Sequence, residues 1–158
     1  GGFMERSQLP EVVFERAKTL PVPLIIWDRD SSLLIVSLSE ENDYSGEFIN
    51  TGRVCIALGE SMQAVDIEVN YSPSELTVVP DLVMPEGFAA LVRFPDSYLI
   101  VDTISQMQAL PDYSAMHLWY LSLPESEILH LRVAENVIFD ITIDNRLAGI
   151  WIGNITQR

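Results

Sequence analysis

The segment from Val137 to Ile152 constrains the fold most, because it is typical of two β-strands that fold back on each other. Asp144 and Asn145 favour the turn, since both residue types tolerate the left-handed backbone of tight hairpins. The turn could lie at 144–145 or at 145–146. In both registers one apolar face forms, from Val137, Phe139, Ile141, Ile143, Ala148, Ile150 and Ile152. The sequence therefore predicts an antiparallel hairpin that buries one face.

Short apolar segments separated by turn residues recur along the chain and predict a mostly β protein of the α+β class, built from antiparallel hairpins. Further strands are expected at 24–27, 33–38, 47–50, 54–58, 64–69, 76–79, 88–94, 98–101, 116–121 and 128–133. The strands 88–94 and 98–101 are expected to pair over Pro95-Asp96-Ser97. An N-terminal helix is predicted over 7–20, with Pro10 in its first turn and an apolar stripe of Val13, Ala17 and Leu20. A second, short helix could span 103–110, after Asp102.

The length of 158 residues suits a single compact domain over residues 4–158. Gly1-Gly2-Phe3 is interpreted as the remnant of an added tag, and Met4 as the native start. No secretory signal pattern follows Met4, so a cytoplasmic protein is expected. The longest apolar runs are far shorter than the roughly 18 residues of a membrane span. A single cysteine excludes an internal disulfide framework.

An internal repeat is indicated when the chain is shifted by 83 residues, which places Leu33–Asn70 on Met116–Gly153 without a gap. Few residues are identical, but strand, acidic loop, strand and hairpin follow in the same order. The repeat halves would be 24–70 and 113–153, joined by 71–112, in which 71–74 is the best linker candidate. A true duplication would give two similar sheets related by a pseudo-two-fold axis, whereas chance similarity between β-rich segments remains the alternative.

The segments Trp27-Asp28, Leu34–Ser39 and Ala64–Val69 resemble short bacterial proteins grouped as domain of unknown function 2283. That family opens with an aromatic-Asp turn and a strand, and closes on a hairpin with turn glycines. The closing motif is also similar to Asp140–Ile152. Met62 and Asn145 stand where the family has a turn glycine, and Asp66 replaces its second glycine. The resemblance covers about half the chain in two pieces, and it implies no activity, because the family has none assigned.

The charge balance is the least ordinary feature of the composition. Nine basic residues face 23 acidic ones, which gives a formal net charge of −14. Such a surface repels polyanions, so DNA, RNA and anionic membranes are not expected as partners. The excess charge could serve solubility alone, or it could steer a basic protein partner to the surface.

Ser61 is the weak candidate for a catalytic residue, because Gly59-Glu60-Ser61-Met62-Gln63 follows an apolar strand in the manner of a nucleophile elbow. However, Gln63 stands where that motif requires a small residue, and the next segment is a predicted strand rather than a helix. A tight β-turn explains the same residues.

Metal and cofactor motifs are not found. His117, His130 and Cys55 are far apart in the sequence and lack zinc-binding spacing, so both histidines are interpreted as core or surface residues. Asp28–Ser32 begins like a calcium loop but lacks the required glycine and final glutamate. Phosphate-binding glycine motifs are absent from the sequence. No cofactor and no metal is expected.

We expect a non-catalytic protein-binding module with a basic protein partner, or one that forms a homodimer. An immunity-type inhibitor of a basic toxin is a more specific hypothesis in that class. The alternatives are a small hydrolase that uses Ser61 and a structural homo-oligomer. The expected interaction surface comprises Trp27, Glu40, Glu41, Asp43 and Trp151, with Trp119 as a further exposed aromatic candidate. For the tryptophans, core packing remains the alternative.

Overall fold

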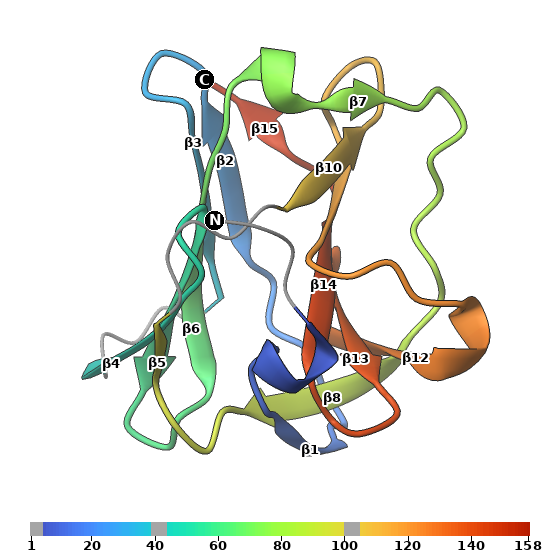
Figure 1. The fold of residues 1–158 in the computed structure, drawn as a ribbon. Coiled ribbons are helices and arrows are strands. Elements are labelled where there is room, and N and C mark those ends of the chain that lie inside the picture. Colours follow the sequence, from blue (N-terminus) through green and yellow to red (C-terminus); the bar gives the residue numbers. More distant parts are fainter. Residues whose placement is uncertain (1–4, 39–43, 100–104) are drawn as a thin grey trace.

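The fold is mostly β and consists of two mixed sheets that pack face to face, as the ribbon drawing of the computed structural model shows (Figure 1). The structure describes residues 5–38, 44–99 and 105–158. The interpretation of residues 1–3 as a tag lies outside the described residues. None of the described helical segments has the length and apolar character that crossing a lipid bilayer requires.

The seven-stranded sheet, on the left in Figure 1, has the order β15-β2-β3-β6-β5-β4-β9. Its strands are β2 (Leu24–Asp28), β3 (Leu33–Ser37), β4 (Tyr44–Asn50), β5 (Val54–Gly59), β6 (Ala64–Asn70), β9 (Tyr98–Leu99) and β15 (Thr156–Gln157). The pairs β15–β2 and β4–β9 are parallel, and the other neighbours are antiparallel.

The eight-stranded sheet has the order β1-β8-β12-β13-β14-β11-β10-β7. Its strands are β1 (Val13–Arg16), β7 (Thr77–Val78), β8 (Phe88–Arg93), β10 (Gln106–Ala109), β11 (Met116–Trp119), β12 (Ile128–Ala134), β13 (Val137–Thr142) and β14 (Leu147–Ile152). The pairs β10–β7 and β12–β8 are parallel, and the other neighbours are antiparallel.

Apart from β1, the two sheets have the same topology. The order β9-β4-β5-β6-β3-β2-β15 corresponds strand by strand to β8-β12-β13-β14-β11-β10-β7, including both parallel pairs. The central hairpins have a register shift at the same place, between Ala57 and Leu58 in one sheet and between Asp140 and Ile141 in the other. These positions differ by 83 residues, the shift indicated by the sequence. When the halves are extended to β2–β7 and β10–β15, the last strand of each half, β7 or β15, pairs with the first strand of the other half, β10 or β2.

The predicted helix over 7–20 is wrong. The described residues of this segment form a 3₁₀ turn, η1 (Arg6–Gln8), followed by strand β1, which pairs with β8. Val12 is buried and Phe14 packs against the core, whereas Val13 and Glu15 are exposed. This two-residue alternation is typical of a strand and overrides the helical spacing of Val13, Ala17 and Leu20.

Two further predictions about the middle of the chain are wrong. Residues 106–109 form strand β10 rather than a helix, because Met107 and Ala109 are buried on one side while the glutamines face the other. Residues 103–104 of that predicted helix, and Asp102 before it, lie outside the described residues. The described parts of the segments 88–94 and 98–101, β8 and β9, do not pair, and residues 100–101 lie outside the described residues. Strand β8 belongs to the eight-stranded sheet and β9 to the seven-stranded sheet. The chain crosses from one sheet to the other after β8, and Phe94 is fully buried at this crossing.

The hairpin at 137–152 is present as β13 and β14, and Asn145 has the left-handed backbone expected in its turn, with φ of 61°. Phe139 lies opposite Ile150, and Val137 lies opposite Ile152, so the predicted apolar face is confirmed for these residues. Ile143 is an exception and is 67% exposed, because β13 ends at Thr142. All residues of β13 are buried, so both faces of this strand are covered.

One core cluster contains buried side chains of both sheets, including Ile56 and Ile67 from one and Phe139 and Ile150 from the other. A buried polar contact also joins the sheets, because the hydroxyl groups of Thr51 and Tyr120 lie 2.8 Å apart. The predicted linker at 71–74 begins inside the core: Tyr71 is 3% exposed and stacks on Trp27.

Candidate functional site

Four neighbouring strands of the eight-stranded sheet bring distant polar residues to one spot. Asp140 on β13 lies opposite His130 on β12 and opposite Gly149 on β14. In the adjacent row, Trp151 on β14 lies opposite His117 on β11. Val137, Phe139 and Ile141 belong to the core between the sheets, and Asp140 alternates with them. These polar side chains therefore lie on the outward face of the sheet.

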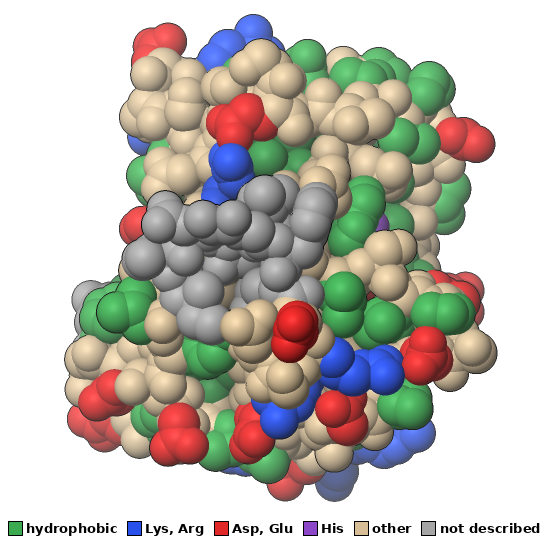
Figure 2. Space-filling model, viewed as in Figure 1, with side chains coloured by type: hydrophobic (Ala, Val, Ile, Leu, Met, Phe, Trp, Pro, Cys, Tyr) green, Lys and Arg blue, Asp and Glu red, His purple; other side chains and the backbone are tan. Residues whose placement is uncertain are grey.

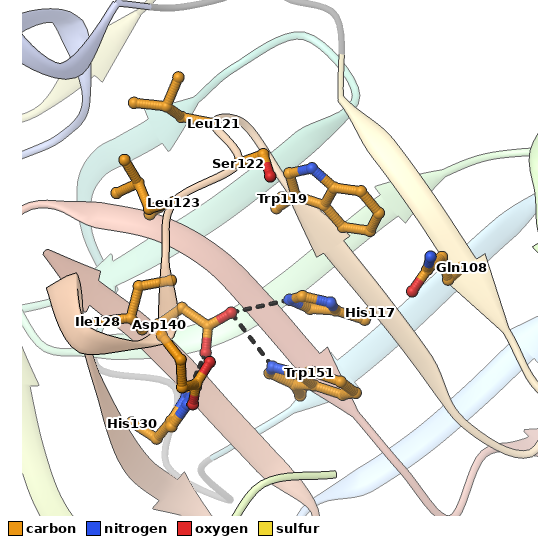
Figure 3. Close-up of a pocket in the computed structure, with 12 residues that line it drawn as sticks. Gln108, His117, Trp119, Leu121, Ser122, Leu123, Ile128, His130, Asp140 and Trp151 are labelled. Carbon is orange, nitrogen blue, oxygen red and sulfur yellow. Dashed lines mark hydrogen bonds and ion pairs between the residues drawn. The ribbon is translucent and has the colours of Figure 1, made fainter. Parts of the chain in front are cut away.

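Asp140 is the centre of this cluster, as the dashed lines in Figure 3 show. Its Oδ2 accepts hydrogen bonds from Nε2 of His117 at 2.8 Å and from Nε1 of Trp151 at 3.2 Å. Its Oδ1 accepts from Nδ1 of His130 at 2.6 Å. Nε2 of His130 in turn contacts Glu125. We call His117, Glu125, His130, Asp140 and Trp151 the histidine–aspartate cluster.

The electrostatics of the cluster follow from this hydrogen bonding. Asp140 is 3% exposed, and its burial alone favours the neutral acid, but hydrogen bonds from the two histidines reverse this and lower its pKa. The hydrogen bond to Asp140 raises the pKa of His130 to about 9, against the opposing effect of burial and with further help from Glu125. At neutral pH His130 is a cation held between two carboxylates, so these three groups together carry one negative charge.

Gly149 provides the space that Asp140 occupies. A Cβ atom at this position would lie 2.8 Å from the carbonyl oxygen of Leu118 and 2.9 Å from Oδ2 of Asp140. Both distances are shorter than a carbon–oxygen contact allows, and the first involves backbone that cannot move easily. A side chain at position 149 would therefore displace the carboxylate from its hydrogen-bond donors.

Aromatic rings line the pocket beside the cluster. The ring of His117 stacks on Trp151, with centroids 3.8 Å apart and an interplanar angle of 8°, and lies 5.0 Å from the ring of Trp119. The pocket has a volume of about 270 Å³. Figure 3 shows that Leu121, Ser122 and Leu123, in the segment after β11, line it as well. The Glu125 side chain is 76% exposed at this site.

The corresponding row of the seven-stranded sheet lacks the cluster. There the cross-strand partners are Phe48, Ala57, Asp66 and Ser37, where the eight-stranded sheet has His130, Asp140, Gly149 and Trp119. The two halves thus share strand order and buried apolar positions, but they differ in the residues of this outward row. Only the second half has a buried carboxylate at this position.

Ser61, the catalytic candidate from the sequence, lies in the exposed turn between β5 and β6. Its hydroxyl donates a 2.6 Å hydrogen bond to Oε1 of Gln63. Both histidines contact Asp140 on the other sheet, so the structure does not bring Ser61 and a histidine together.

The described residues of the expected interaction surface do not lie together on one surface. Trp27 is completely buried in the core between Tyr71 and Tyr113, so its side chain has no surface to offer a partner. Trp151 is half-buried and belongs to the histidine–aspartate cluster, and Trp119 lines the adjacent pocket. Glu40, Glu41 and Asp43 lie outside the described residues.

Sequence reasoning missed the cluster because His117, His130 and Asp140 are distant along the chain and meet only through the strand register. One signal was present, since Asp140 is a charged residue between Phe139 and Ile141 in a predicted strand that is otherwise rich in apolar residues. A carboxylate in such a position requires hydrogen-bond donors from neighbouring strands. The histidines were the available titratable donors.

Among residues 5–38, 44–99 and 105–158, no three histidine, cysteine or acidic side chains are placed to hold a metal ion. In the cluster, the histidine nitrogens that face Asp140 act as hydrogen-bond donors to its carboxylate. In comparisons with known proteins, neither a family model nor a curated protein matches this chain.

Proposed function

We propose that the protein is a non-catalytic binding module that contacts a basic protein partner at the pocket beside the histidine–aspartate cluster. The observation that carries this proposal is the combination of half-buried aromatic walls and an exposed carboxylate, Glu125, beside the hydrogen-bonded pair of His130 and Asp140. Aromatic side chains in a rigid, partly apolar pocket are typical anchors of protein interfaces.

The hydrogen bonding of the cluster favours binding over catalysis. Asp140 accepts three hydrogen bonds, and both ring nitrogens of His130 are engaged by carboxylates. A general acid or base needs an atom that can reach the substrate. Nδ1 of His117 is the ring nitrogen of the cluster that forms no hydrogen bond with the described residues. Asp140 and His130 therefore lack a free atom for proton transfer, which supports a role for these two residues in holding the pocket walls in place, whereas Nδ1 of His117 stays open to a ligand.

The charge of the chain supports a basic partner. Acidic side chains are spread over the face shown in Figure 2 rather than gathered in one patch, and basic side chains lie mainly near its lower edge. A net charge of −14 produces a negative field that speeds the approach of a cation. An immunity-type inhibitor of a basic toxin remains the specific hypothesis within this class.

Quantitative capture from the native host tests this function. We expect the wild-type protein to retain a basic protein that is released by raising the salt concentration, and that rebinds after purification. Trp119→Ala should weaken this binding, whereas Val22→Ala, at an exposed apolar residue that does not line the pocket, should not. Retention of no basic protein, or binding that is indifferent to salt, contradicts the proposal.

We also propose that the two sheets arose by duplication of a unit with the strand order of β2–β7, residues 24–78. The shared topology and the equivalent bulges support this, as does the exchange of β7 and β15 between the halves. An ancestral unit of this kind would form a homodimer by swapping its last strand. Homologues with one copy and a swapped dimer would support the proposal, and homologues in which only one half keeps this topology would contradict it.

A further inference from the structure

The pocket beside the histidine–aspartate cluster has a size and a charge that restrict what it can hold. Its volume of about 270 Å³ lies below the roughly 300–1,000 Å³ of pockets for drug-sized ligands. A single long side chain is a better match than a nucleotide or a cofactor.

The polar groups of the pocket favour a cation over an anion. His130 carries a positive charge, but both of its N–H groups already point at carboxylates and cannot donate to a ligand. Glu125 has one oxygen in contact with His130, and its side chain is 76% exposed. Its other oxygen can accept a hydrogen bond from a ligand. An anion would meet this carboxylate with no charged donor to compensate.

The walls of the pocket favour a planar cation. Trp119 and Trp151 lie on either side of the His117 ring, and all three line the pocket. Flat aromatic surfaces attract cations through their ring electrons, and a guanidinium group also stacks on them. A guanidinium group presents several N–H donors in one plane, which suits a neighbouring carboxylate. A lysine ammonium shares the charge but not the flat shape.

We propose that the pocket receives an arginine side chain of the partner, with its guanidinium group stacked against Trp119 and hydrogen-bonded to Glu125. This inference rests on the proposed function, because it names the chemical group through which the basic partner is recognised. His130 and Asp140 keep Glu125 and the aromatic walls in place and do not contact the guanidinium group directly.

The probe for this inference is N-acetyl-arginine methylamide, compared with its citrulline and lysine counterparts. Citrulline has the same shape as arginine without the charge, and lysine has the charge without the planar group. Binding is followed by NMR through the indole N–H signals of the three tryptophans. We expect arginine to shift the signals of Trp119 and Trp151 while the signal of buried Trp27 stays in place. Affinity should fall from arginine to lysine, and citrulline should bind weakest.

Glu125→Gln provides the matched test, because the glutamine oxygen can still accept a hydrogen bond from His130. It should weaken arginine binding roughly fivefold or more. Glu127→Gln is the control, since Glu127 is paired with Arg6 and does not line the pocket. Equal binding of citrulline and arginine, or unchanged binding by Glu125→Gln, overturns the inference.

The inference and the proposed function can fail separately. If a purified basic partner binds wild type and Glu125→Gln equally but binds Trp119→Ala more weakly, the pocket is still the interface, and the arginine site is wrong while the proposed function stands. If the arginine derivative binds as expected but no basic protein does, the chemistry of the pocket is right and the proposed function is wrong.

Discussion

Nδ1 of His130 lies 2.6 Å from Oδ1 of Asp140, across the antiparallel pair β12–β13. The two residues are direct cross-strand partners on the outward face, so the register of the sheet sets their distance. Because Asp140 is almost completely buried, water can replace this contact only if the side chains that cover the carboxylate move. The stability of the folded protein therefore depends on the protonation states of His130 and Asp140.

The stability of the protein should decrease in alkaline solution because of His130. Its pKa is raised from 6.5 to about 9 in the folded state, so between these values the folded state holds a proton that the unfolded state has released. The stabilisation is complete below pH 6.5 and is lost as the pH rises through 9. It is on the order of a few kcal/mol. His130→Gln keeps a donor for Asp140 but does not titrate, so its melting temperature should depend less on pH over this window. Parallel curves for wild type and variant, measured by circular dichroism, would contradict the assignment.

Acid should destabilise the protein through Asp140. The pKa of this carboxyl is lowered in the folded state, so its stabilisation is present above the ordinary value of 3.8 and is lost as the pH falls through the lower folded value. Urea unfolding of wild type and Asp140→Asn between neutral pH and pH 3 measures this effect. The difference in stability between the two proteins should shrink towards low pH. A difference that stays constant would mean that Asp140 does not hold its charge in the folded state.

Removing the carboxylate of Asp140 should lower the free energy of unfolding by more than the small size of the group suggests. Asp140→Ala leaves the N–H groups of His117, His130 and Trp151 without their acceptor, which should lower the free energy of unfolding by about 2–4 kcal/mol. Asp81→Ala, at an exposed position, should change it by less than ~0.5 kcal/mol. Chemical denaturation compares the two. Similar stabilities would show that the hydrogen bonds of Asp140 contribute little.

Gly149→Ala should be harmful although alanine is small. The new Cβ would meet the backbone oxygen of Leu118 and the carboxylate of Asp140, so we expect a loss of about 1–3 kcal/mol and a displaced Asp140. An NMR titration should show the pKa of His130 returning towards its ordinary value. Gly153→Ala is the matched control, because its Cβ would crowd the sulfur of Met84, which belongs to a flexible side chain, and would meet Asn136 at ordinary contact distances. The idea fails if both variants are equally stable.

The contact between Thr51 and Tyr120 should stabilise the packing of the two sheets. Both side chains are buried, and burial raises the pKa of Tyr120, so its hydroxyl stays protonated. Tyr120→Phe leaves the Thr51 hydroxyl without this partner and should cost about 1–2 kcal/mol. Thr51→Val combined with Tyr120→Phe should cost less than the sum of the single changes. Additive losses in thermal unfolding would show that the two hydroxyls do not interact.

The local pattern of the sequence predicts most of the strands. Alternating apolar residues and turn residues identify the central hairpins correctly, since Val54–Gly59 and Val137–Thr142 form strands and Asn145 adopts the turn backbone. The same reasoning fails at 7–20, where helical and strand spacings of apolar residues overlap and the edge of the sheet selects the strand. The prediction of a hairpin from β8 and β9 also fails. A hairpin would be the shorter connection, but the chain crosses from one sheet to the other between these two strands.

The sequence by itself determined most of the strands and the apolar face of the hairpin at 137–152, because these depend on neighbours along the chain. The tertiary structure alone decided that Trp27 is buried, that Ser61 is remote from both histidines, and that His117, His130 and Asp140 meet. The physical reason is that cross-strand register joins residues far apart in sequence. A one-residue change of register would turn these side chains to the opposite face of the sheet.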